Sequence, residues 1–338
     1  MKIGDYSGLT DTGRKRRRNE DAYVVAPPLF GVADGMGGAQ AGELASGLAA
    51  AAMREANPNG SGEERVSDLI QEANRRVHDR ATTDASASGM GTTMTVALVE
   101  PDGRIVFGHA GDSRAYVLRD NKLDQLTDDH SLVAELVRRG ELSPAEAEVH
   151  PQRSVITRAL GTDPDVDIDT FAVSPQQGDV FLICSDGLSS YVDGEEIERI
   201  MVRHRDDLNA GTKALIQAAN RGGGDDNITA ILFRVEEGGE ETAAQEPDEQ
   251  TRELAALPGD DEDTLHPEDG IAPPPPAEPA PTAVDTMVVS ADDIHAAIAE
   301  HETSEAPQAG FGRRLLALLV IIALIAVIVA LVWWGLAR

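Results

Sequence analysis

Residues 29–38 read LFGVADGMGG, an apolar run that ends in one carboxylate and then in glycine. The pattern predicts a buried strand that delivers Asp34 to the mouth of a site and then turns sharply on Gly35, Gly37 and Gly38. A side-chain oxygen and nearby backbone carbonyls would then be exposed together. Oxygen donors suit hard cations, so the stretch predicts a cation site at the edge of a sheet.

Two further carboxylates stand at the ends of apolar runs. Residues 179–188 read DVFLICSDGL and place Asp186 directly after a run, and residues 223–229 read GGDDNIT just before another. Taken singly, Asp-Gly after a strand is most often a turn in which the aspartate bonds its own backbone. Arg16 with Glu20 and Asp21, and the stretch HAGDSRAY at 109–116, add a basic residue and more acids near apolar runs. The joint pattern predicts one acidic cluster.

Residues 315–334 form a long apolar stretch near the end of the sequence. Its twenty residues, LLALLVIIALIAVIVALVWW, are enough to cross a bilayer core of about 30 Å. Trp333 and Trp334 at one end and Arg313 and Arg314 at the other are typical of membrane interfaces. Buried helices of globular domains are rarely apolar on every face, so we expect a membrane span in an anchor at 313–338.

We expect the part of the chain that precedes this anchor to lie in the cytoplasm. Residues 1–21 contain no apolar stretch long enough for a signal peptide. Two arginines precede the span and one, Arg338, follows it, and the side with more positive charge is expected to be cytoplasmic. The single cysteine, Cys184, lies inside an apolar run, which excludes an intrachain disulfide and fits a reducing compartment. The expected location is the cytoplasmic membrane, in a single-pass protein whose large N-terminal part is cytoplasmic.

Charge divides the 338 residues, whose net charge is −30, into three parts. Residues 1–235 carry net −13, residues 236–312 carry −20 and residues 313–338 carry +3. Ten of the 18 prolines also lie in the middle part. High charge and many prolines cannot bury enough surface to offset chain entropy. Residues 236–312 are therefore predicted to be a disordered tether between a folded domain, 1–235, and the anchor.

The folded domain shows strands joined by short turns and helices in separate blocks. Hairpins are predicted over 21–33, 92–110 and 114–126, with later strands at 166–173, 180–184 and 228–235. Helices are predicted at 40–56 and 63–83 and from 193 and 208, with a surface insertion over 131–151. This order favours an α+β fold of antiparallel sheets flanked by helices over a Rossmann alternation. Gly222–Gly224 lacks the Lys-Ser/Thr of a P-loop, which argues against nucleotide binding.

The candidate site residues fall into ordered motifs: Thr10-Asp11-x-Gly13-x-x-Arg16-x-x-Asn19-Glu20-Asp21, Ala33-Asp34-Gly35-Met36-Gly37-Gly38, Gly91-Thr92-Thr93, Gly111-Asp112-Ser113-Arg114, Ser185-Asp186-Gly187 and Asp226-Asn227-Ile228-Thr229. In this order they resemble the metal-dependent protein serine/threonine phosphatases of protein phosphatase 2C type, in their compact bacterial form. The resemblance covers roughly residues 5–235. It implies an αββα sandwich with a binuclear metal centre at one end of the sheets.

The resemblance also implies two Mn²⁺ or Mg²⁺ ions and a set of ligands. By this resemblance Asp34 bridges both ions, and Gly35 offers its carbonyl. Asp186 and Asp226 hold one ion, and Glu20 and Asp21 support the other, partly through water. Asp112 together with Asp186 is the implied site of a third, weaker ion. Arg16 would clamp the phosphate of phosphoserine or phosphothreonine. A water activated by the two metals would attack phosphorus in line. All-oxygen ligands suit Mg²⁺ or Mn²⁺, and the chain has no Cys/His pattern of a zinc site.

Two positions depart from the family pattern. Met36 stands where some eukaryotic relatives have a histidine as a possible leaving-group acid, which favours metal-bound water as the proton source. Asp225 and Asp226 are adjacent, so the ligand is ambiguous by one position, and Asp226 is preferred because it precedes Asn-Ile-Thr. The basic cluster 14–18 is interpreted as a rim that attracts phosphoproteins, and no nucleic-acid binding is expected.

Two other functions compete with the phosphatase. An inactive phosphopeptide-binding module would keep Arg16 but lose metal acids, and a membrane scaffold would leave the complete acid set unexplained. The expected partners are Ser/Thr-phosphorylated proteins and a cognate bacterial Ser/Thr kinase. Thr264 and Thr286 each follow acids and precede apolar residues, and a phosphothreonine there would suit a forkhead-associated domain protein.

Overall fold

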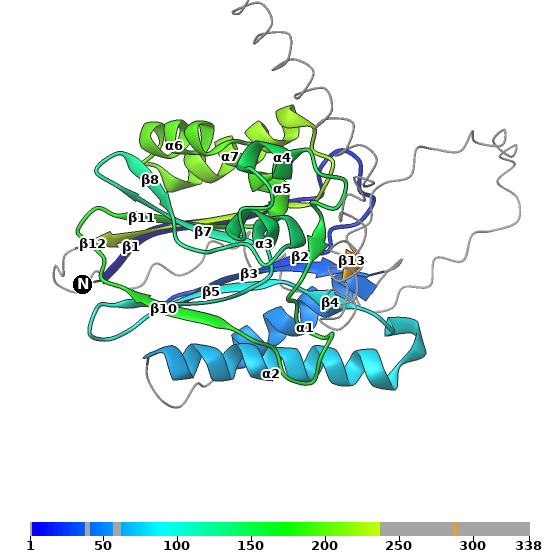
Figure 1. Cartoon of the computed structure of the whole chain (residues 1–338). Coiled ribbons are helices and arrows are strands. Elements are labelled where there is room, and N and C mark those ends of the chain that lie inside the picture. Colours follow the sequence, from blue (N-terminus) through cyan, green and yellow to red (C-terminus); the bar gives the residue numbers. More distant parts are fainter. Residues whose placement is uncertain (1, 38–40, 57–61, 237–286, 289–338) are drawn as a thin grey trace, which may run out of the picture. The chain divides into compact units, whose positions relative to one another are not determined.

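The computed structural model of this chain describes residues 2–37, 41–56, 62–236 and 287–288. Within these ranges two antiparallel sheets lie face to face, and helices cover the outer side of each (Figure 1). The first sheet has the order β10-β6-β5-β3-β2. Its strands are β2 (Asp21–Ala26), β3 (Leu29–Met36), β5 (Met94–Val99), β6 (Ile105–Ala110) and β10 (Asp169–Val173), and the short β4 (Gly91–Thr92) pairs with β3.

The second sheet has the order β1-β12-β11-β7-β8. Its strands are β1 (Lys2–Asp11), β7 (Arg114–Arg119), β8 (Lys122–Gln125), β11 (Val180–Cys184) and β12 (Ile228–Glu236). Asp120 and Asn121 form the tight turn between β7 and β8, and both have positive φ angles, 52° and 62°. Asn and Asp tolerate this backbone conformation better than other non-glycine residues, which explains why the sequence predicts a hairpin there.

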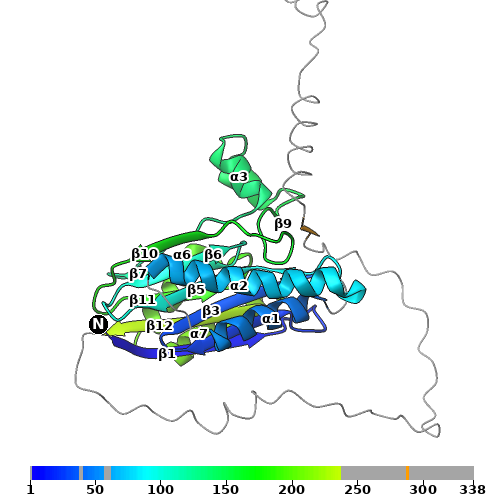
Figure 2. The same ribbon diagram turned by 90° about the horizontal axis from the view of Figure 1, so that it is seen from below.

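Each sheet is covered by its own helices. The first sheet carries α1 (Ala41–Glu55) and α2 (Gly62–Thr83), followed by the short 3₁₀ helix η1 (Ala85–Ala87), and the second carries α5 (Asp186–Ser189), α6 (Gly194–Arg203) and α7 (Leu208–Gly222) (Figure 2). A segment between β8 and β10 holds α3 (Leu132–Arg138), α4 (Pro144–Glu148) and β9 (Val155–Ile156). Ser143 begins α4 with a capping box, in which its hydroxyl and the Glu146 side chain each accept a backbone amide.

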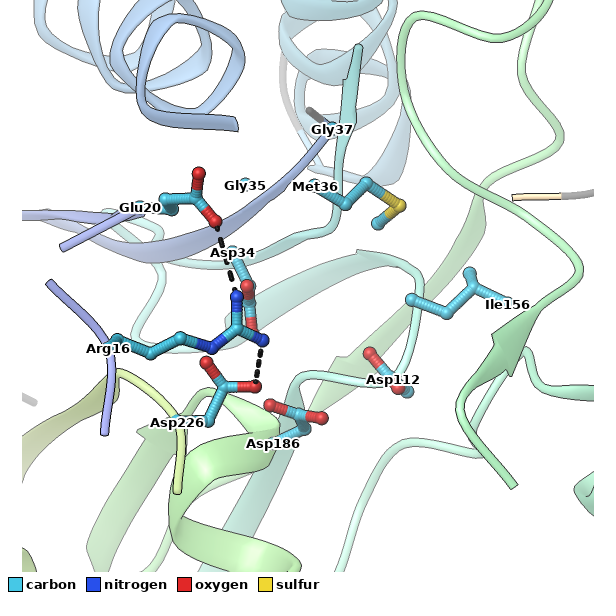
Figure 3. Close-up of a pocket in the computed structure, with 10 residues that line it drawn as sticks. All are labelled: Arg16, Glu20, Asp34, Gly35, Met36, Gly37, Asp112, Ile156, Asp186 and Asp226. Carbon is cyan, nitrogen blue, oxygen red and sulfur yellow. Dashed lines mark hydrogen bonds and ion pairs between the residues drawn. The ribbon is translucent and has the colours of Figure 1, made fainter. Parts of the chain in front are cut away.

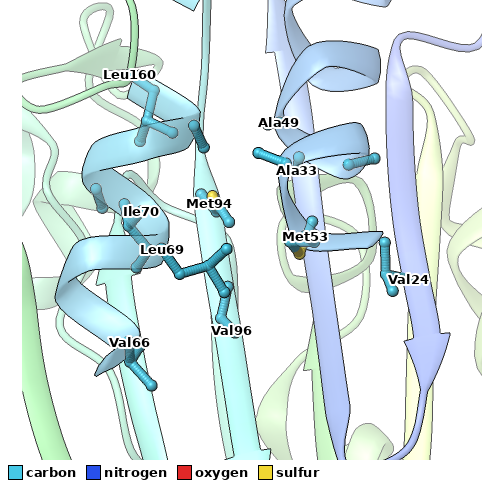
Figure 4. Packing of buried hydrophobic residues seen from close by; sticks show 14 of the residues in the cluster. Val24, Ala33, Ala49, Met53, Val66, Leu69, Ile70, Met94, Val96 and Leu160 are labelled. Atoms are coloured by element: carbon cyan, nitrogen blue, oxygen red, sulfur yellow. The ribbon is translucent and has the colours of Figure 1, made fainter. Parts of the chain in front are cut away.

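Aromatic rings fill the space between the two sheets. Phe30 of the first sheet stacks on Phe233 of the second with ring centroids 4.3 Å apart, and Phe181 stacks on Phe233 at 5.1 Å. Each of these rings is fully buried and contributes about 1.5–3 kcal/mol by leaving water. A second cluster packs α1 and α2 onto the first sheet through residues such as Met53, Ile70 and Val96 (Figure 4). The sheets are therefore buried on both faces, which accounts for their nearly continuous apolar runs.

The expected α+β sandwich of two antiparallel sheets flanked by helices is confirmed. Three local expectations differ. The strand through Asp34 continues to Met36, because Gly35 pairs with Thr92 of β4, so the chain does not turn at Gly35. The strand expected from residue 166 begins only at Asp169, where pairing with β6 starts. β1 was not expected, because its sequence KIGDYSGLTD lacks a continuous apolar run, and it is a strand by pairing with β12.

The expected membrane span at 315–334 lies outside the described residues, as do Thr264 and Thr286. In the part of the chain that the structure describes, no helix has the length and apolar character to span a membrane. The expected tether, 236–312, also lies outside it except at two places. Glu236 ends β12, and Met287–Val288 forms a short strand, β13, that pairs with β9. The expectation of disorder throughout the tether is therefore not met at β13, where two apolar residues find an open strand edge.

Candidate active site

A pocket opens at the end of the sheets where β3 and β11 finish and β12 starts. Its lining residues are Arg16, Glu20, Asp34, Gly35, Met36, Gly37, Asp112, Ile156, Asp186 and Asp226. Five carboxylates and one guanidinium therefore border the same space, and Figure 3 shows Asp34, Asp112, Asp186 and Asp226 directed toward it. Antiparallel pairing explains the convergence, because it brings the ends of some strands beside the starts of others. The cluster predicted from the sequence is thus present in space.

The backbone of β3 holds Asp34 rigidly. The Asp34 amide donates to the hydroxyl of Thr93 at 3.1 Å, and the Asp34 carbonyl accepts from the Thr93 amide at 2.8 Å and the Thr92 hydroxyl at 2.8 Å. Gly35 lies so close to the start of α1 that a Cβ atom there would stand 2.0 Å from the carbonyl oxygen of Gly42. Only glycine therefore fits beside Asp34, which explains the Asp-Gly pair in physical terms.

Asp21 lies beneath the pocket rather than in its lining. Its Oδ2 atom accepts hydrogen bonds from the Thr229 hydroxyl at 2.6 Å and the Ser185 hydroxyl at 2.8 Å. Its Oδ1 atom is buried and has no hydrogen-bond partner among the described residues. Burial raises the pKa of Asp21 to about 6, although the two hydroxyl bonds oppose the shift. A buried carboxylate oxygen without a partner is costly, so this atom needs a compensating positive group.

Three acids of the pocket, Asp34, Asp112 and Asp186, have raised pKa values. Burial and then the charges of Asp21, Asp186 and Asp226 raise the pKa of Asp34 well above its usual range. Burial and then Asp112 and Asp226 do the same for the pKa of Asp186, and the pKa of Asp112 rises to about 7, again chiefly through burial. Crowded carboxylates of this kind are typical of functional sites, because a charged ligand can stabilise all of them at once.

Among the described residues that line the pocket, Arg16 is the basic one. Its Nη2 atom donates to Asp226 at 2.9 Å, and its Nη1 atom lies 3.6 Å from Glu20. The guanidinium therefore joins two of the acids predicted to bind metal (Figure 3). The neighbouring Asp225 instead forms an ion pair with Lys15 at 2.5 Å and is absent from the pocket lining, which supports the choice of Asp226 over Asp225.

Asn227 fixes the loop that carries Arg16. Its side-chain oxygen accepts the Glu20 amide at 2.7 Å, and its side-chain nitrogen donates to the carbonyls of Thr12 at 3.0 Å and Arg18 at 2.9 Å. Gly13 packs against the same strand end, where a Cβ atom would stand 2.1 Å from the Asp226 carbonyl oxygen. Sequence reasoning assigned Asn227 no role beyond its place in a motif. Its three partners lie more than 200 residues away in sequence, and only the motif pointed to its importance.

The pocket side chains border a common space without closing around one point. Among residues 2–37, 41–56, 62–236 and 287–288, no three acidic, histidine or cysteine side chains stand close enough to enclose a cation as they are. The donor set itself suits a hard cation, because it consists of carboxylate and carbonyl oxygens. The unpartnered Oδ1 of Asp21 and the raised pKa values of Asp34 and Asp186 show that these negative charges lack compensation. The chemistry of the donor set therefore fits divalent cations.

The sequence of this chain was compared with those of known protein families. The sequence profile described as Protein phosphatase 2C matches residues 14–232. The chain belongs to the protein phosphatase 2C family. The matched region contains every predicted site residue of the chain, from Arg16 to Asp226.

This family member is similar to several bacterial phosphatases. It is 42% identical over 235 residues to the serine/threonine phosphatase stp of Listeria welshimeri, covering 66% of this chain and 92% of that protein. It is similar to the crystal structure of the serine/threonine phosphatase PstP/Ppp of Mycobacterium tuberculosis, with a TM-score of 0.64, 36% identity, and coverage of 70% and 100%. A further similar structure is the PstP catalytic domain in complex with two manganese ions, with a TM-score of 0.62, 34% identity, and coverage of 70% and 99%.

Proposed function

We propose that this member of the protein phosphatase 2C family hydrolyses phosphoserine and phosphothreonine in proteins, with the help of divalent metal ions. The observation that carries the proposal is the ring of five carboxylates with Arg16 among them. Such a site repels a phosphate on its own and becomes attractive to one only when cations are present. The relatives named as serine/threonine phosphatases support the same activity.

The residues that would hold the ions are those of the pocket floor. Asp34 would be shared by two Mn²⁺ or Mg²⁺ ions, and Gly35 would offer its carbonyl. Asp186 and Asp226 would hold one ion, and Glu20 and Asp21 would support the other, partly through water. Asp112 with Asp186 would take a third, weaker ion. The two manganese ions in the related PstP structure support the number and the metal. When bound, such ions would acidify water to give a nucleophile and would offset the negative charge on the phosphoryl oxygens and on the leaving ester oxygen.

The chain's own residues position the phosphate. Arg16 would bind two phosphate oxygens, and it must then exchange its contacts with Asp226 and Glu20 for the substrate. Asn227 holds the backbone before Arg16 at Thr12 and after it at Arg18, which limits the entropy lost when the guanidinium binds. Met36 and Ile156 give the pocket an apolar wall, against which the chain of a phosphoprotein can pack.

The proposal is tested with the Asp34→Asn variant and with chelation. Wild-type protein should hydrolyse phosphothreonine peptides with Mn²⁺ and lose the activity in excess chelator, and Asp34→Asn should lower kcat by orders of magnitude. Mn²⁺ should also raise the melting temperature of wild type more than that of Asp34→Asn, which measures metal binding without turnover. Asp102→Asn, at an exposed turn, is the control. Full activity in chelator would refute the metal requirement, and tight phosphopeptide binding without turnover would favour the inactive binding module.

We further propose that residues 313–338 anchor the protein in the cytoplasmic membrane. The apolar stretch 315–334 and its flanking Arg and Trp residues support a single span. The acidic, proline-rich residues 236–312 would then tether the domain, 1–235, on the cytoplasmic side, where it would oppose a Ser/Thr kinase. This proposal rests on sequence alone.

A forkhead-associated domain protein is proposed as a partner of the tether. Thr264 follows residues 261–263, which are all acidic, and Thr286 follows Asp285 and precedes three apolar residues. A kinase could phosphorylate either threonine, and an arginine-bearing domain could then recognise the phosphate together with Val289. The test is intact-mass analysis of Asp34→Asn protein coexpressed with its kinase. Absence of phosphate on both threonines would end this proposal.

A further inference from the structure

A short stretch of the tether pairs with a strand beside the pocket. Met287–Val288, the strand β13, runs parallel to β9, with Met287 opposite Val155 and Val288 opposite Ile156. Figure 2 shows β13 next to β9, apart from the two main sheets. Residues 237–286 separate β13 from the end of β12, so the contact is made by a distant part of the chain.

β9 offers an open edge for this pairing. On one side it bridges to Ser131, and the Thr157 amide donates to the His130 carbonyl at 2.9 Å. The Val155 amide donates to the Gln152 carbonyl at 3.1 Å. The amides of Val155 and Thr157 thus have partners within the domain, and the amide of Ile156, which lies between them, can donate to an added strand. Edges of this kind pair readily with extended segments.

The same strand forms part of the pocket wall. Ile156 lines the pocket together with Asp112 and Asp186, as Figure 3 shows for its side chain. Ile156 also packs against Met36, two residues after Asp34, and against Ala159 in a small buried cluster. A segment that pairs with β9 therefore lies beside a strand that forms part of the pocket wall.

We propose that β9 is a docking strand and that the tether occupies it through Met287–Val288, in competition with extended phosphoprotein segments. The sequence around β13, Val284 to Val289, suits this role, because it is rich in β-branched residues inside an otherwise acidic and proline-rich region. The pairing itself does not depend on the reaction, whereas the competition rests on the phosphatase function proposed above.

The pairing is short, so the docked state is reversible. Two residue pairs give few hydrogen bonds, and each is worth only about 0.5–1.5 kcal/mol net. Covalent attachment offsets this weakness, because a segment of the same chain meets its docking site at an effective concentration on the order of 1 mM. A soluble substrate at micromolar concentration then meets a strand that is occupied for part of the time. The tether therefore acts as a weak built-in competitor.

The experiment uses the full chain in mild detergent and a double variant, Met287→Pro with Val288→Pro. Proline removes the amides of both residues and does not fit a paired strand. The matched control is Ala283→Pro, which places a proline nearby but outside β13. Hydrogen exchange of the peptide covering residues 153–157 should be faster in the double variant than in wild type and the control. The KM for an extended phosphothreonine peptide should fall about two- to fivefold in the double variant, and that for para-nitrophenyl phosphate should not change.

Each outcome has a separate meaning. Equal exchange at residues 153–157 in all three proteins would overturn the docking of β13 on β9, even if all of them are active. Faster exchange with an unchanged KM for the peptide would overturn the competition. Absence of hydrolysis of either substrate by all three proteins with Mn²⁺ would refute the proposed phosphatase function, and the exchange measurement would still decide the docking.

Discussion

Arg16 and Arg18 lie two residues apart in the same basic cluster but in different surroundings. The Arg16 side chain is 28% exposed and its guanidinium bonds Asp226, whereas the Arg18 side chain is 51% exposed and lies 3.6 Å from Glu43. Charge alone would make the two residues equivalent for attracting a phosphoprotein. Their positions favour Arg16 over Arg18 for the proposed contact with the phosphate itself.

The two arginines should therefore differ on mutation. Arg16→Ala should lower kcat/KM at all salt concentrations, because it removes direct phosphate contacts. The ratio of the two kcat/KM values should correspond to a loss of about 2–4 kcal/mol of transition-state stabilisation. Arg18→Ala should have a small effect that disappears at high salt, because exposed charges are screened. The measurement is kcat/KM for one phosphopeptide over a range of ionic strength. Parallel behaviour of the two variants would show that Arg16 is only part of a general basic rim.

His109 gives a prediction on pH. It is buried, with Nδ1 2.9 Å from the Thr95 hydroxyl and Nε2 3.1 Å from the Asp128 carbonyl oxygen. Burial and the neighbouring His130 lower the pKa of His109 to about 4. The unfolded chain therefore takes up a proton below pH of about 6.5, before the folded protein does. Stability should fall as the pH drops from about 6.5 to about 4, by about 3 kcal/mol for this group.

The measurement compares the free energy of unfolding of wild type and His109→Gln between neutral and acidic pH. The variant loses packing and hydrogen bonds at every pH but lacks this proton uptake. The difference in stability between the two proteins should therefore shrink as the pH falls. A difference that stays constant over this range would show that His109 keeps an ordinary pKa in the fold.

At the scale of elements, the contact between β3 and α1 determines where Asp34 lies. Gly35 of β3 meets the Gly42 carbonyl at the start of α1, and a Cβ atom on Gly35 would stand only 2.0 Å from that oxygen. The Gly35 amide also donates to the Glu20 carbonyl at 3.1 Å. The strand, the helix and the loop that bears Glu20 thus meet at a single residue without a side chain.

Gly35→Ala should separate these elements. We expect a loss of about 1–3 kcal/mol in unfolding free energy, as for overpacked sites, and a large loss of kcat because Asp34 moves. Gly47→Ala on α1 is the matched control, because a Cβ atom there meets nothing within 4 Å. That variant should keep its activity and gain up to about 1 kcal/mol from helix propensity. The measurements are the free energy of unfolding in denaturant and kcat for both variants. Equal changes in Gly35→Ala and Gly47→Ala would contradict the close approach of β3 and α1.

At the scale of the whole molecule, the membrane proposal sets the orientation. Only residues 335–338 need to cross the membrane if the span is 315–334, and the arginines at 313–314 should stay on the cytoplasmic side. Protease added to intact spheroplasts should leave the phosphatase domain uncut, and lysis should expose it. A cytoplasmic protein serves as the control for leakage. Cleavage of the domain in intact spheroplasts would overturn the proposed location and its access to cytoplasmic substrates.

The sequence alone determined the chemistry of the site and the type of fold. Asp34 and Asp186 could be identified because each lies within or directly after an apolar run beside glycine, and this pattern depends only on neighbouring residues. The turn at Asp120–Asn121 and the capped α4 are local in the same sense. These features follow from backbone preferences that act over a few residues, so they can be predicted from short stretches of sequence.

Only the tertiary structure decided how those residues are supported. The hydroxyls that bind Asp21 come from Ser185 and Thr229, and the amide that holds the loop of Arg16 comes from Asn227. β1 is a strand because β12 pairs with it, and β13 is a strand because β9 has an open edge. These contacts join residues that are far apart in sequence. Their energy appears only after the chain has closed the intervening loops, so no local pattern records it.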